Sequence, residues 1–160
     1  MIAIETGVQY GDLLALTRSD FDLIKQEVSI TKSYSSEAKM VTKPKNKSSI
    51  RVIPIFSRLT KTMTNYFNKN DELNLFSYWS NQTVQNNLRR MLKSAGAHQI
   101  RFHGLRHSHV SYLLHNGVDI DYISKRVGHS NIGITLSVVY SHMLKEKEQT
   151  QRELALNLSG

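Results

Sequence analysis

Residues 102–142 read FHGLRHSHVSYLLHNGVDIDYISKRVGHSNIGITLSVVYSH, and this stretch decides how the rest of the chain is interpreted. It begins with His103, Arg106 and His107, whose i, i+3, i+4 spacing gathers two imidazoles and a guanidinium on one side of a helix that opens near Gly104. Arg supplies a planar fork of donors for phosphate oxygens, and His adds a donor that can also move a proton. The spacing therefore predicts an anion pocket at the start of this helix.

Two more helices are expected downstream of this pocket. Asp119 is a suitable N-cap and Gly128 a suitable C-terminal stop for a short helix, which delivers His129 to the same region. A third helix brings up Tyr140. A phenol near a guanidinium and several imidazoles is a candidate nucleophile for phosphate-ester chemistry, so these residues together predict a phosphoryl-transfer site.

Length and composition limit the class of protein. A chain of 160 residues fits one domain that buries its own hydrophobic core without a disulfide or a structural metal. It contains no Cys, which fits a reducing cytoplasm. The net charge of +8 and the sequence pI near 9.8 favour an anionic partner, with nucleic acid as the first candidate. No apolar run approaches the ~20 residues that span a bilayer, so no membrane partner is expected.

A metal site is the main alternative for the paired histidines. His103 and His107 have the i, i+4 spacing of zinc ligands on a helix, but no Glu lies between them in the H-E-x-x-H order. The chain also offers no Cys ligand. The sequence therefore predicts neither a metal nor another cofactor.

The segment before the pocket predicts a mixture of helices and strands. Alternating apolar and polar residues predict three short strands that would form one antiparallel sheet, namely Val28–Thr31, Met40–Thr42 and Arg51–Pro54. Amphipathic spacing predicts helices over Tyr10–Leu16, Ser57–Asn68 and Asn81–Ala95. Residues 1–7 read as the last turn of a helix that Gly7 caps, with its earlier turns missing.

The motifs form an ordered series. It consists of His103-Gly-Leu-Arg106-His107, then Gly128-His129-Ser130, and then Thr135 and Tyr140-Ser-His142. This series closely resembles the second catalytic box of the tyrosine recombinases, the phage and transposon integrases, and the resemblance runs from Thr6 to about Leu144. It implies an α+β fold, a mainly α-helical catalytic domain with a small three-stranded antiparallel sheet. It also implies a site-specific recombinase that cleaves and rejoins DNA through a 3′-phosphotyrosyl intermediate.

The resemblance implies a role for each member of the site. Tyr140 would attack the scissile phosphodiester and leave a free 5′-hydroxyl. Arg106, His103 and His129 would stabilise the phosphate oxygens, and His103 could also act as the base on the phenol. Lys45 would be the general acid that protonates the leaving oxygen.

The choice of Lys45 rests on a lysine-rich connector between two predicted strands. Counting back from Ile53-Pro54, Lys45 matches the hairpin lysine of the resembled family best. Lys43 and Lys47 stay open because the length of this hairpin varies. A solvated hairpin tip without a catalytic role is the alternative for the whole connector.

Two features depart from the family pattern. Gln9 stands where the first catalytic box of the family has an Arg, and Gln carries no charge to balance that of a pentacoordinate phosphate. Tyr140 follows His129 by eleven positions, which is longer than usual, with a Val138-Val139 doublet in between. An added residue inside a helix rotates the later residues by about 100°, whereas a loop absorbs it. Both departures keep open a degenerate or truncated integrase that binds DNA without efficient cleavage.

Asp12 and the chain ends complete the expectations. Asp12 matches an acidic position that supports the site in the family, and a carboxylate on the helix surface is the alternative. The chain, residues 1–160, is expected to be the catalytic-domain fragment of a longer integrase whose N-terminal DNA-binding domains are missing. Residues 145–160 resemble the terminal segment that such recombinases dock onto a neighbouring subunit, which predicts a homo-oligomer on double-stranded DNA. A topoisomerase would use the same strand-cleavage chemistry, and it is the least favoured alternative because the motif sequences resemble those of integrases.

Overall fold

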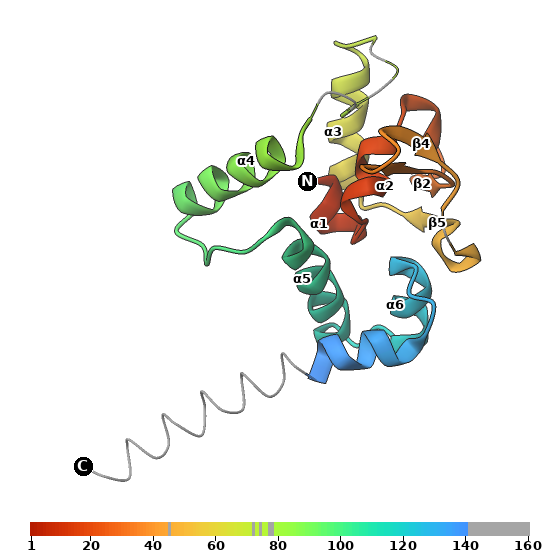
Figure 1. The fold of residues 1–160 in the computed structure, drawn as a ribbon, viewed down its shortest axis with the longest axis vertical. Helices are drawn as coiled ribbons and strands as arrows, with labels where there is room; N and C mark the ends of the chain where they lie inside the picture. Colours follow the sequence, from red (N-terminus) through yellow and green to blue (C-terminus); the bar gives the residue numbers. More distant parts are fainter. Residues whose placement is uncertain (45, 72, 74, 77–78, 141–160) are drawn as a thin grey trace.

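The computed structural model describes residues 1–44, 46–71, 73, 75–76 and 79–140. The elements in chain order are α1 (Ile2–Thr6), α2 (Tyr10–Ala15), η1 (Arg18–Asp20), β1 (Phe21–Asp22), β2 (Glu27–Ile30), β3 (Ser33–Ser35), β4 (Met40–Thr42), η2 (Lys47–Ser49), β5 (Arg51–Pro54), α3 (Ser57–Phe67), α4 (Asn81–Ser94), α5 (Phe102–His115) and α6 (Ile120–Val127). A further helix covers residues 132–140. Figure 1 shows α1 at the centre, with the sheet and α3 on one side and α5 and α6 on the other.

The caps that the sequence predicts are present at both short helices. Gly7 ends α1 with φ 66°, and Gly128 ends α6 with φ 75°, a left-handed conformation that favours glycine. The Asp119 carboxylate accepts hydrogen bonds from the N–H groups of Asp121 and Tyr122, the first free donors of α6. These local signals explain why the predicted helix ends agree closely with the structure.

The predicted three-stranded sheet exists, but one of its strands differs. The order is β1-β2-β5 and both pairings are antiparallel, with Val28 opposite Ile53. Met40–Thr42, which was expected in this sheet, pairs instead with Ser33–Ser35 in a separate two-stranded hairpin. Met40 and Val41 are exposed, so this strand offers no apolar side to the core. The place of the missing strand is taken by the two residues of β1.

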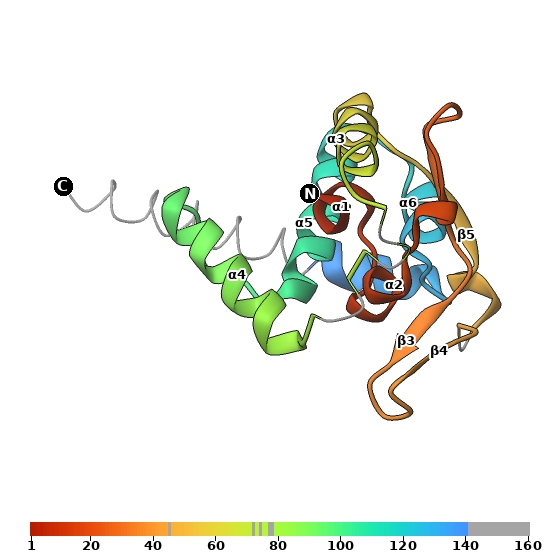
Figure 2. The same cartoon turned by 90° about the horizontal axis from the view of Figure 1, so that it is seen from above.

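The β3–β4 hairpin projects from the body of the protein, as Figure 2 shows. Its base packs on α2 at Gly11, where an added Cβ would lie 2.7 Å from Ser33 Oγ and 2.8 Å from the Tyr34 carbonyl oxygen. A larger residue than glycine would therefore push β3 away from α2. This close approach sets one side of the cavity described below.

Two hydrophobic clusters stabilise the fold. The first joins α1, α2, the sheet and α3, and its fully buried side chains include Val28, Ile53 and Leu59. The second joins α5, α6 and helix 132–140 through Val110, Leu113, Ile123, Val127 and Val139. Each fully buried aliphatic side chain of this size contributes about 1.5–3 kcal/mol relative to exposure. No helix among the described residues is long and apolar enough to cross a membrane.

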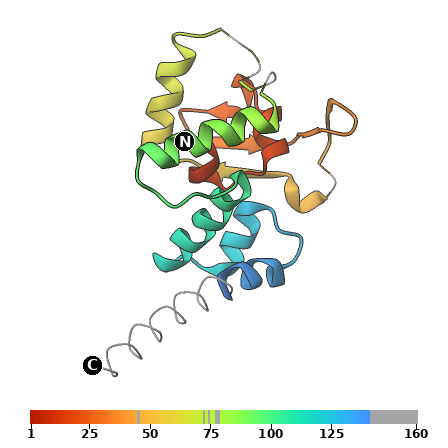
Figure 3. The same ribbon diagram turned by 60° about the vertical axis from the view of Figure 1, so that its left-hand side comes forward.

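A buried polar joint connects the two clusters. The Arg126 guanidinium of α6 donates to the carbonyl oxygens of Glu5 (3.2 Å) and Pro54 (2.9 Å), and its Nε donates to His109 Nε2 (3.1 Å). Burial and then the charge of Arg126 lower the pKa of His109 to about 4, so this imidazole is neutral and accepts the bond. α4 lies apart from the sheet, on the far side of α1 from β5 (Figures 1 and 2), and Figure 3 shows α5 and α6 together on one side of the sheet. The hydrogen bonds of Arg126 fix α5 and α6 against α1 and the sheet.

Candidate functional site

A cavity of about 690 Å³ lies where α2, the hairpin and its connector, α5 and the turn after α6 meet. Three of the residues predicted for the site line it, namely His103, Arg106 and His129. They come from positions up to 26 residues apart in the sequence, and helix caps and apolar packing bring them together. The spatial cluster that the motif spacing implies is therefore present, while the catalytic role of each residue remains a prediction.

Arg106 is the central cation of this cavity. The residue is 2% exposed, and its Nη1 donates to the Gly7 carbonyl oxygen at 2.8 Å. Its Nε and Nη2 are also buried but have no hydrogen-bond partner among the described residues. Burial, then the charge of Arg51, lowers the pKa of Arg106 to about 10, which still leaves it charged at neutral pH. Leaving such donors unpaired costs about 1–3 kcal/mol each, so the site is built for an anion that accepts from them.

His103 and His107 lie together near the N-terminus of α5. Their ring centroids are 4.7 Å apart in an edge-to-face arrangement, and both residues line the cavity. Partial burial and then the charge of Arg106 lower the pKa of His103 below its usual value. His103 is therefore neutral at physiological pH and able to accept a proton, which is the property that a general base requires.

His129 is held in a defined orientation in the turn after α6. Its Nδ1 is 2.8 Å from the Oγ1 of the fully buried Thr135. When the Thr135 hydroxyl donates to Nδ1, the ring proton sits on Nε2, and His129 becomes a neutral donor for a phosphate oxygen. Burial, then Arg106, lowers the pKa of His129 to about 4, with smaller contributions from His103, His107 and Arg51 in that order. The imidazole thus stays uncharged across the physiological range.

Tyr140 does not line this cavity in the structure. It is the last described residue of helix 132–140 and is 65% exposed, whereas Ile134 and Val138 of the same helix line the cavity. Two residues beyond Val138 correspond to a rotation of about 200°, which turns the phenol to the other side of the helix. The Val138-Val139 doublet is helical, so a residue added here rotates Tyr140 and is not absorbed by a loop.

The lysines of the connector differ in position. Lys43 lines the cavity, together with Pro44 and Asn46. Lys47 is exposed in η2 and is not among the described residues that line the cavity. Lys45, the predicted general acid, lies outside the described residues, so the choice among the three lysines stays open.

Asp12 and Gln9 form the α2 side of the cavity. Asp12 is buried, and its Oδ2 accepts long hydrogen bonds, both 3.4 Å, from the Gln9 N–H and from Arg51 Nη2. The interpretation of Asp12 as a carboxylate on the helix surface is therefore wrong. Gln9 lines the cavity without supplying a charge.

Three residues with buried polar side chains were missed from the sequence, namely Arg51, Arg126 and His109. Arg51 was interpreted only as the start of a strand, and His109 received no role. One signal was available for Arg126. It lies three positions after Ile123 and therefore falls on the buried side of α6, where an arginine needs specific partners.

The fold and the cavity define the class of protein. It is an α+β domain whose buried guanidinium and neighbouring imidazoles suit a phosphate ester. The sequence model of the phage integrase family matches residues 1–147. The chain therefore belongs to the phage integrase family of tyrosine recombinases, as its motifs predict.

Individual relatives agree with this assignment. The ICEBs1 integrase of Bacillus subtilis is 31% identical over 172 residues, which cover 96% of this chain and 46% of that protein. A XerC-like tyrosine recombinase of Caldanaerobacter subterraneus is 29% identical, covering 98% of this chain and 48% of that protein. The chain thus spans about half the length of the curated relatives it matches.

Solved structures confirm the predicted fold class. The Tn1549 transposon integrase in complex with circular intermediate DNA superposes with a TM-score of 0.72 at 18% identity, covering 93% of this chain and 57% of that one. The XerA recombinase superposes with a TM-score of 0.67 at 23% identity, covering 94% of this chain and 54% of that one. At these identities the likeness establishes the α+β fold alone.

Proposed function

We propose that this chain carries the catalytic domain of a site-specific DNA recombinase, an integrase that cleaves and rejoins double-stranded DNA through a 3′-phosphotyrosyl intermediate. The observation that carries the proposal is that two buried donor atoms of Arg106 have no partner in the part of the chain that the structure describes, inside a cavity that His103 and His129 also line. A phosphodiester brings anionic oxygens that accept from such donors. Family membership supplies the reaction class.

The residues divide the reaction between them. The Tyr140 oxygen attacks the phosphorus, its proton passes to neutral His103, and the bond from phosphorus to the 5′ oxygen breaks. Arg106 and His129 donate to the phosphate oxygens as their charge grows. A lysine of the connector, namely Lys43, Lys45 or Lys47, protonates the departing 5′ oxygen. A 5′-hydroxyl of a partner strand then attacks the phosphotyrosine and releases the phenol, so no external energy source is needed.

Attack requires a change in the position of the Tyr140 side chain. Reacting atoms must approach to about 3–3.5 Å, whereas the phenol of Tyr140 is exposed and outside the cavity. Binding of DNA is therefore coupled to a rearrangement of residues near Tyr140. This requirement gives the protein a simple safeguard, because the nucleophile stays away from the phosphate site until substrate arrives.

Charge and apolar surface suggest the partners. The net charge of +8, with exposed Arg89, Arg90 and Lys93 on α4, supports binding to the phosphates of duplex DNA in the cytoplasm.

An apolar cavity of about 590 Å³ opens between α4 and the core, where Trp79 and Met91 are exposed. We infer that it receives the leucine-rich residues 154–158 of a neighbouring copy, which would produce a homo-oligomer on DNA.

Covalent capture tests the proposed function. The full-length protein is incubated with a nicked attachment-site duplex, on which cleavage releases a short strand and traps the covalent complex. The expected result is a protein–DNA adduct with the native chain and none with Tyr140→Phe. Absence of an adduct from the native chain, under conditions where it binds the duplex, would favour the binding-only alternative that Gln9 raises.

A further inference from the structure

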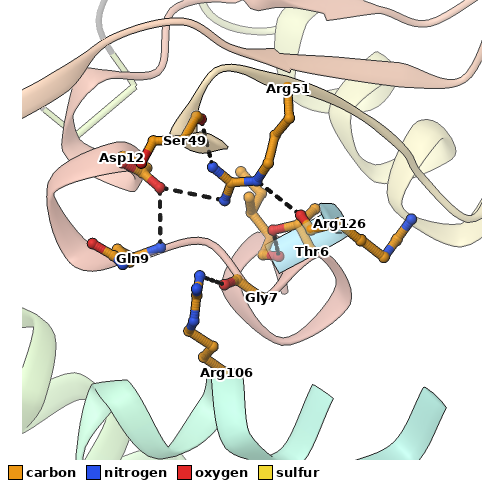
Figure 4. Close-up of polar contacts among 9 residues, drawn as sticks. Thr6, Gly7, Gln9, Asp12, Ser49, Arg51, Arg106 and Arg126 are labelled. Atoms are coloured by element: carbon orange, nitrogen blue, oxygen red, sulfur yellow. Dashed lines mark hydrogen bonds and ion pairs between the residues drawn. The ribbon is translucent and has the colours of Figure 1, made fainter. Parts of the chain in front are cut away.

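Arg51 lies next to the cavity that Arg106 lines, and its side chain contacts three segments around that cavity. Its Nε donates to the Arg126 carbonyl oxygen at 2.8 Å, and its Nη1 donates to the Ser49 carbonyl oxygen at 2.7 Å. Its Nη2 reaches the Asp12 carboxylate at 3.4 Å. Figure 4 shows this side chain joining the end of α6, the connector before β5 and the start of α2.

The turn that carries His129 rests on the same guanidinium. An added Cβ at Gly128 would lie 2.8 Å from Arg51 Nη1 and 3.1 Å from the Ser48 carbonyl oxygen. Gly128 is therefore required both for its positive φ and for the close approach of Arg51. Because His129 is the next residue, Arg51 also sets where that imidazole enters the cavity.

Asp12 has two possible cationic partners. Its side chain is 6% exposed, and it contacts Arg51, whose side chain is 8% exposed. Asp12 and Arg106 line the same cavity. Burial and then the charge of Arg51 lower the pKa of Arg106, and the Asp12 carboxylate offsets part of this effect. A buried carboxylate without a cation is costly, so Asp12 without Arg51 would draw on the free donors of Arg106.

We propose that Arg51 is a positioning residue that engages Asp12 and so keeps available, for a phosphate oxygen, the two donor atoms of Arg106 that have no partner among the described residues. The inference rests on the proposed function, because it takes the ligand of the cavity to be a phosphodiester. Arg51 itself is not among the described residues that line the cavity, so it acts through Asp12 and Gly128 and not by touching substrate.

Three variants separate this role from a purely structural one, in which Arg51 only holds neighbouring segments together through its bonds to Ser49 and Arg126. Arg51→Met leaves Asp12 without its cation, and Arg51→Met combined with Asp12→Asn removes the competing charge as well. Arg51→Lys keeps a cation beside Asp12 while losing the fork that bonds two carbonyl oxygens. A purely structural Arg51 predicts that Asp12→Asn rescues nothing, because the bonds to Ser49 and Arg126 remain absent.

The experiment is a titration of the chain with inorganic phosphate at low salt and neutral pH, followed by the NMR signal of the Arg106 Nε–H. The native chain should bind phosphate, Arg51→Met should bind at least about tenfold more weakly, and the double variant should return to within about threefold of native. Circular dichroism melts establish that each variant is folded. If Arg51→Met does not fold, Arg51→Lys decides, and it is expected to bind within about threefold of native.

The possible failures are distinguishable. If phosphate does not perturb Arg106 in the native chain, the phosphate site itself and the inference built on it are both wrong. If the native chain binds but the double variant is as weak as Arg51→Met, the phosphate site stands and the role of Arg51 is overturned. A tenfold loss in Arg51→Lys would likewise overturn it.

Discussion

Replacing Arg106 with Gln should nearly abolish cleavage while leaving the fold intact. The native side chain has one donor on the Gly7 carbonyl oxygen and two buried atoms, Nε and Nη2, without a partner in the described ranges of the chain. Each hydrogen bond from a charged donor contributes about 1.5–3 kcal/mol, so two that strengthen in the transition state supply about 3–6 kcal/mol. The expected loss in the rate of strand cleavage is about 10²–10⁴-fold.

The assay is single-turnover formation of the covalent adduct on a nicked duplex, with thermal unfolding measured in parallel. Lys61→Gln is the matched control, since it also replaces a cation with Gln, at an exposed position on α3 that does not line the cavity, and it should change the rate less than about threefold. A folded Arg106→Gln protein that cleaves within about threefold of native would refute the argument, because the unpartnered donors would then have no part in the reaction.

Three further results are expected. Gly128→Ala should destabilise the protein more than Gly117→Ala does in denaturant melts, because both have positive φ but an added Cβ meets Arg51 only at Gly128; equal losses would contradict the close approach. The NMR titration of His129 should give a midpoint near 4, and because its folded pKa lies below the unfolded value, its contribution to stability should fall as pH drops from about 6.5 to 4. A midpoint near 6.5 would contradict the burial of His129 and the effect of the neighbouring cations on its pKa. Gln9→Arg should raise the cleavage rate with little change in DNA affinity, whereas Gln82→Arg, the same added charge at an exposed site, should not.

Much of the site could be predicted because its signals are local. The i, i+3, i+4 spacing on α5 places His103 and Arg106 together without any knowledge of the rest of the fold. The end of α6 follows from a glycine that adopts positive φ, and His129 comes directly after it. Such features depend on neighbours within one or two helical turns, and they agree with the structure.

Features that depend on distant partners could not be predicted in the same way. Arg51 and Asp12 are 39 residues apart, and nothing in either neighbourhood indicates that they meet. The pairing of Met40–Thr42 depends on whether a hairpin or the sheet offers the better edge, which alternation of residues does not encode. The side of helix 132–140 on which Tyr140 lies depends on the packing of Val138 and Val139 against the rest of the fold.

In the proposed reaction, Tyr140 becomes joined to the 3′-phosphate of a cleaved strand in the cavity of Arg106. Protease digestion and mass spectrometry of the trapped complex test this most directly. We expect a nucleotide linked through its 3′-phosphate to the peptide that contains Tyr140, and a free 5′-hydroxyl on the released strand. A nucleotide on another residue, or linkage through a 5′-phosphate, would contradict it.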